Sequence, residues 1–64
     1  MSNPATFADQ LRGARKAADL TQHGMADRTL IPFRTLQDWE GGRRTPPPYV
    51  QRFVLNELAS LKKE

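Results

Sequence analysis

The feature that most constrains the fold is a pair of short helical segments separated by a corner of about three residues. The first runs over 21–29 and the second over 32–40. Thr21 is a favourable N-cap for the first. Pro32 suits the first helical position of the second, because proline lacks the amide hydrogen that has no partner there. Gly41 and Gly42 then end that helix. The spacing predicts two helices packed at a tight corner.

The second of these segments has two unlike faces. One face is mostly apolar and can be buried, whereas the other offers a guanidinium, an amide and a carboxylate, groups that can read the edges of nucleic-acid bases. At about 100° per residue, the first face comprises Pro32, Thr35, Leu36 and Trp39, and the second comprises Phe33, Arg34, Gln37, Asp38 and Gly41. The alternative is an ordinary amphipathic helix whose polar face is only solvated.

Two further helices flank this pair. Thr6 can cap a first helix over about 6–18, and a last helix runs over about 47–62. Both carry an apolar stripe at helical spacing. The first stripe is Phe7, Leu11, Ala14 and Ala18, and the last is Val50, Phe53, Val54, Glu57, Leu58 and Leu61, with Leu55 to one side. We therefore predict an all-α protein with a single domain spanning residues 1–64.

Composition limits the chemistry available to the chain. It has 64 residues, no cysteine and one histidine, so we expect no disulfide, no metal site, no cofactor and no enzymatic centre. The net charge of +3 is compatible with a polyanionic partner. No apolar run is long enough for a signal segment or a membrane span, so we expect a cytoplasmic protein with no membrane partner.

The residues between Leu20 and Pro46 carry a resemblance. Without insertion or deletion, this stretch resembles the Xre/Cro-like, or lambda-repressor-like, helix-turn-helix domains of bacterial and phage regulators. The matching residues are Leu20-Thr21-Gln22, Ala26, Thr35-Leu36, Trp39-Glu40 and Gly42-Arg43-Arg44-Thr45-Pro46. The resemblance implies a compact domain of four, possibly five, helices that binds double-stranded DNA and is associated with the nucleoid.

The resemblance also implies which residues contact DNA. Bases in the major groove would be contacted by Phe33, Arg34, Gln37 and Asp38. Phosphates would be contacted from the start of the second helix and from the loop after the third. The expected phosphate contacts are Thr21, Gln22, His23, Arg43, Arg44 and Thr45, of which His23 is as readily an idle surface residue. Arg15 occupies the position of an arginine that pairs with Glu40.

The base-contacting residues leave alternatives open. Arg34 can bond guanine or a phosphate, and Gln37 can pair with adenine or contact a phosphate. Phe33 can pack on a thymine methyl group or fold back onto Leu30. Asp38 can accept a hydrogen bond from cytosine or orient Arg34 at i, i+4, and we favour the second role.

Leu30 departs from the family pattern, which usually has glycine at this corner. Glycine suits the corner because the backbone there often adopts a positive φ. Leu30 therefore implies either strain of about 1–2 kcal/mol or a corner of different shape.

A single recognition helix contacts few base pairs, which favours a homodimer on two half-sites about 34 Å apart. The expected seam is Leu55, Leu58, Leu61 and Lys62, although Leu58 and Leu61 can instead close the core of one copy. We therefore predict a homodimeric repressor of phage or mobile-element type that binds an inverted repeat. The alternative is an antitoxin-like or other protein-interaction module that uses the last helix.

Overall fold

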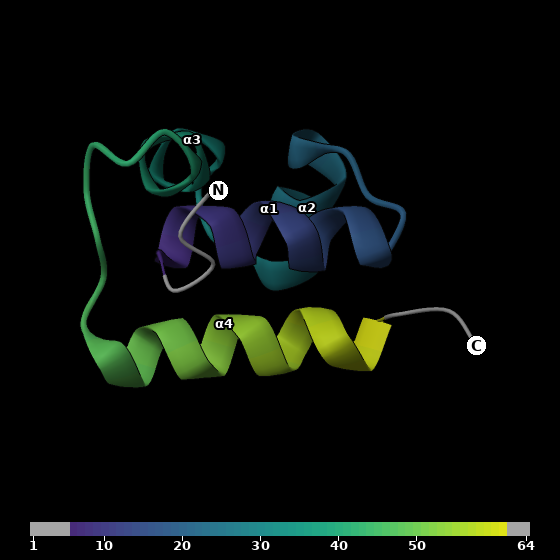
Figure 1. Cartoon of the computed structure of the whole chain (residues 1–64). Helices are drawn as coiled ribbons and strands as arrows, with labels where there is room; N and C mark the ends of the chain where they lie inside the picture. Colours follow the sequence, from purple (N-terminus) through teal and green to yellow (C-terminus); the bar gives the residue numbers. More distant parts are fainter. Residues whose placement is uncertain (1–5, 62–64) are drawn as a thin grey trace.

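The structure, a computed structural model, describes residues 6–61 and is all-α, which confirms the predicted fold class. Its helices are α1 (Phe7–Ala17), α2 (Gln22–Thr29), α3 (Phe33–Glu40) and α4 (Pro48–Leu61). Both α1 and α2 contact α3 and α4. Figure 1 shows α3 and α4 on opposite sides of the α1–α2 pair. The outer faces of α3 and α4 are thus two separate surfaces.

Threonine side chains begin the first two helices. The Thr6 hydroxyl oxygen accepts a hydrogen bond from the Asp9 amide at 3.4 Å, and the Thr21 hydroxyl oxygen accepts one from the Gly24 amide at 2.9 Å. Each bond satisfies an amide that has no partner within its own helix. Both caps agree with the expectation from the sequence.

The corner between α2 and α3 has a left-handed backbone at Leu30, with φ 63° and ψ 20°. Of the two alternatives for this position, the strained one is therefore correct. The Leu30 side chain is 87% exposed, so burial does not compensate for the strain. Pro32 has ψ 138° and is the N-cap rather than the first helical residue. The expected start of this helix was thus one residue early, because extended backbone at Pro32 delays the helix to Phe33.

The core lies where the four helices meet. Leu36 of α3 is fully buried, and the larger Trp39 packs against the core with its ring edge-on to Phe7, at a centroid distance of 5.9 Å. The buried core cluster is Phe7, Leu11, Met25, Leu36, Val54 and Leu58. These side chains fix the rotation of α3 about its own axis, which decides the residues that it turns outward.

The face of α4 that is buried in the core includes residues expected to form the dimer seam. Leu58 is fully buried in the core, so its assignment to a dimer seam was wrong, and Leu55 and Leu61 are partly buried against the same core. Lys62 lies outside the described residues. Phe53, expected within the buried stripe, is 59% exposed. Phe53 precedes Val54 by one residue, which separates the two side chains by about 100° around the helix, so once Val54 is buried Phe53 lies at the edge of the packed face.

Candidate nucleic-acid interface

Helix α3 turns the expected DNA-reading residues away from the core. Arg34 and Gln37 are exposed, and Phe33 and Asp38 are half-buried. Leu36 lies on the opposite side and is fully buried. The split between an apolar and a polar face, predicted from the 3.6-residue period, is therefore present in the structure. A guanidinium and a carboxamide are thus both exposed on one short helix.

The loop after α3 folds back onto the end of that helix. The Asp38 carbonyl accepts hydrogen bonds from the amides of Arg43 at 2.9 Å and Arg44 at 3.4 Å. Gly42 permits this reversal with φ 77°, a value that L residues rarely adopt. The exposed residues Arg43, Arg44 and Thr45 are consequently held next to α3.

The Asp38 side chain has a different partner from the one expected. Its carboxylate lies 3.9 Å from Nε of Arg44, whose side chain is mostly exposed. The structure pairs Asp38 with this loop arginine, and the expected role of Asp38 in orienting Arg34 stays a prediction. The i, i+4 spacing on α3 allowed the expected contact, but the folded-back loop brings a second cation to the same carboxylate.

His23 and Phe33 form an aromatic stack between α2 and α3. Their ring centroids are 3.9 Å apart and their planes differ by 2°. Phe33 therefore packs on His23, and the suggestion that it folds back onto the largely exposed Leu30 was wrong. His23 is exposed and Phe33 is half-buried. Sequence reasoning assigned both residues to the DNA-binding face but gave no signal that they touch each other.

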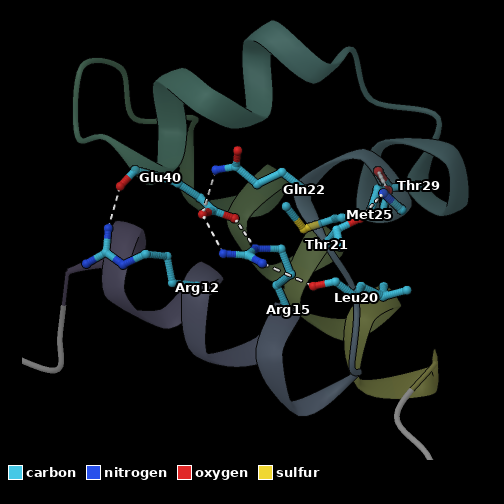
Figure 2. A network of polar contacts seen from close by, with 9 residues as sticks. Arg12, Arg15, Leu20, Thr21, Gln22, Met25, Thr29 and Glu40 are labelled. Carbon is cyan, nitrogen blue, oxygen red and sulfur yellow. Dashed lines mark hydrogen bonds and ion pairs between the residues drawn. The ribbon is translucent and has the colours of Figure 1, made fainter.

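A buried polar network fixes the end of α3, as Figure 2 shows. The Glu40 side chain is only 4% exposed, and its carboxylate accepts hydrogen bonds from Arg15, at 2.8 Å from Nε and 3.3 Å from Nη2. The same guanidinium donates to the Leu20 carbonyl at 3.0 Å. The ion pair implied by the family resemblance is thus present, and it joins α1 to α3 with its charges mutually satisfied.

Two further side chains donate to Glu40. The Gln22 amide nitrogen donates to the carboxylate at 3.0 Å, and Arg12 donates to the backbone carbonyl. Gln22 therefore directs its donor into the network, and its expected phosphate contact stays a prediction. The exposed Thr21, whose hydroxyl accepts from the Gly24 amide, stays a predicted phosphate contact as well.

Within residues 6–61, no group of three or more histidine or acidic side chains is placed to hold a metal ion. No helix in the same range is both long and apolar enough to cross a bilayer.

The fold and this surface define a small all-α protein in which α2 and α3 form a helix-turn-helix. The chain is similar to "Repressor protein C" of Escherichia phage P2, with 38% identity over 55 residues. The aligned segment covers 86% of this chain and 54% of that repressor, so the chain spans about half the length of this curated relative. No family model and no solved structure matches the chain.

Proposed function

We propose that the chain is a DNA-binding transcriptional regulator, a homodimeric repressor of phage or mobile-element type that binds an inverted-repeat operator in the major groove. One observation carries the proposal. Helix α3 displays Arg34 and Gln37 outward while Leu36 and Glu40 anchor its other side. The similarity to a phage repressor supports the same function. Such a protein would act at the nucleoid, in the cytoplasm, and not as an enzyme.

In this proposal α3 reads bases and its neighbours bind the backbone. Arg34 has the geometry to bond guanine O6 and N7 together, and Gln37 can pair with adenine in the same bidentate manner. Arg43 and Arg44 lie in a loop bonded to the end of α3, so they would contact phosphates beside the groove that α3 enters. Because these loop contacts release counterions, affinity should fall steeply with salt.

The homodimer part of the proposal uses the outer face of α4. Tyr49 and Phe53, four residues apart on one face of the helix, are 76% and 59% exposed. They replace the buried Leu58 as the central seam residues. For binding to adjacent half-sites, the two α3 helices of such a dimer would have to lie about 34 Å apart.

The same exposed aromatic pair is the observation that favours the second candidate function, a protein-interaction module. In that case Tyr49 and Phe53 would bind a different protein, and α3 would contribute nothing to affinity. Two results together would support this function over that of a repressor. The chain would show no sequence-specific DNA binding, and it would bind a stoichiometric protein partner that a Tyr49→Ser/Phe53→Ser variant no longer binds.

Selection from random duplex DNA tests the proposal. The protein should enrich an inverted repeat, and its mass on the selected site should correspond to two copies. Recovery of random sequences after selection would contradict the proposal. A single copy bound to the selected site would support the proposed base reading and contradict the proposed homodimer.

A further inference from the structure

The stack between His23 and Phe33 joins the first turn of α2 to the first residue of α3. In the proposed complex the two helix starts make different contacts, because the start of α2 faces a phosphate and the start of α3 enters the groove. Face-to-face contact at 3.9 Å leaves the Phe33 ring little freedom to turn about its side-chain torsions. A phenyl ring held in this way is organised before it meets DNA.

We propose that the His23–Phe33 stack acts as one reading element, in which His23 is the positioning residue and Phe33 contacts a thymine methyl group. The proposal rests on the proposed DNA-binding function and names a chemical determinant of its specificity. Phe33 remains half-buried rather than fully buried, so part of the ring stays accessible. An accessible apolar ring at the start of a groove-entering helix has the thymine C5-methyl as its apolar complement among the base edges.

The role of His23 follows from what the stack does for binding. A free aromatic side chain loses rotational freedom when it binds, and that loss weakens affinity. His23 removes most of this freedom in advance. His23 is also exposed, and a ring N–H of an exposed imidazole can donate to a phosphate oxygen. One side chain thus links a backbone contact to a base contact.

The test uses an operator first selected with the unaltered protein. Each thymine of that operator is replaced in turn by deoxyuridine, which removes only the methyl group. The readout is the ratio of the dissociation constants for the uracil and thymine operators. For the unaltered protein, one thymine per half-site should give a ratio of about three to five, the value expected for burying one methyl group.

Variants assign the effect to the stack. Phe33→Ala should bring the ratio at that thymine to one, and His23→Ala, which keeps the phenyl ring but removes its support, should lower it towards one. His23→Phe restores a stacked ring and should restore the ratio. Preferences at the positions read by Arg34 and Gln37 should persist in all three variants. Circular dichroism confirms that each variant is folded, and Phe33→Leu serves in place of Phe33→Ala if the latter unfolds.

The outcomes separate the two levels of the proposal. If the protein selects no operator, the proposed function itself fails. If it selects one and no thymine is sensitive to loss of its methyl group, the reading role of Phe33 is overturned while the function stands. If His23→Ala keeps the full ratio, the positioning role of His23 is overturned.

Discussion

Arg15 on α1 and Glu40 at the end of α3 lie 25 residues apart in the chain and form a 2.8 Å ion pair in the protein interior. Gln22 of α2 donates to the same carboxylate. Three helices are thereby tied at one charged group. The pair therefore constrains the position of α3 relative to α1, in addition to the hydrophobic packing around Leu36.

The first prediction is that Glu40→Gln strongly destabilises the protein. The substitution leaves the Arg15 guanidinium, only 16% exposed, without its counter-charge. Removing one partner of a buried pair costs about 3–5 kcal/mol, a large part of the stability of a domain this small. Urea unfolding followed by circular dichroism measures the loss.

Arg44→Ala is the matched control for this measurement. Its ion pair with Asp38 is 3.9 Å long and the Arg44 side chain is 79% exposed, so the change should cost less than about 1 kcal/mol. Equal losses in free energy of unfolding would show that the buried Arg15–Glu40 pair stabilises the protein no more than the exposed pair does.

The second prediction concerns the corner at Leu30. Leu30→Gly should raise the free energy of unfolding by about 0.5–1 kcal/mol, because relief of left-handed strain outweighs the extra entropy of glycine in the unfolded chain. Little burial is lost, since the leucine side chain is 87% exposed. Thermal and urea unfolding measure the gain. Leu30→Ala keeps the strained backbone and should give no gain, so equal stabilisation by alanine would assign the effect to the exposed side chain.

The sequence was sufficient to predict the four helices and the two faces of α3. Apolar residues at helical spacing identify a buried stripe when the stripe is narrow, as in Phe7, Leu11, Ala14 and Ala18. Helix α4 was harder, because apolar residues occur around most of its circumference. Which of Phe53 and Leu58 is buried depends on how α4 packs on α1 and α2, and a single helix contains no information about that contact.

The third prediction is that Tyr49→Ser/Phe53→Ser disrupts the proposed dimer and leaves the single copy folded. Both side chains are largely exposed, so the core loses little. Sedimentation over a range of concentrations should show a shift from two copies to one. Leu58→Ala is the contrasting variant. It removes a fully buried side chain and should cost about 2–5 kcal/mol of stability. If the double variant keeps the mass of two copies, α4 does not form the dimer interface.

The fourth prediction separates backbone contacts from base contacts. Arg43→Ala should weaken binding to all DNA sequences alike and reduce the salt slope by about one, because a phosphate contact carries no sequence information. Gel shifts at several salt concentrations, on the selected and on a scrambled duplex, measure both effects. Arg52→Ala, an exposed residue of α4, is the control and should leave the slope unchanged. A loss confined to the selected duplex would instead make Arg43 a base-reading residue.

Two contacts of the candidate site could not have been predicted from the chain alone. The His23–Phe33 stack and the Asp38–Arg44 pair both join segments whose relative placement is set by tertiary packing and by the reversal at Gly42. Helical spacing can identify partners on the same helix, as it suggested for Asp38 and Arg34, but it cannot weigh them against partners that the fold brings from elsewhere.

The proposed function depends most on base reading by the outward face of α3. The most direct measurement compares the affinities of the unaltered protein and Arg34→Ala for the selected operator and for operators in which each guanine is replaced in turn. For the unaltered protein, replacing one guanine per half-site should weaken the free energy of binding by about 1–3 kcal/mol. The affinity of Arg34→Ala should not change on that same replacement. Equal sensitivity of the two proteins at every guanine would contradict the assignment of α3 as the recognition helix.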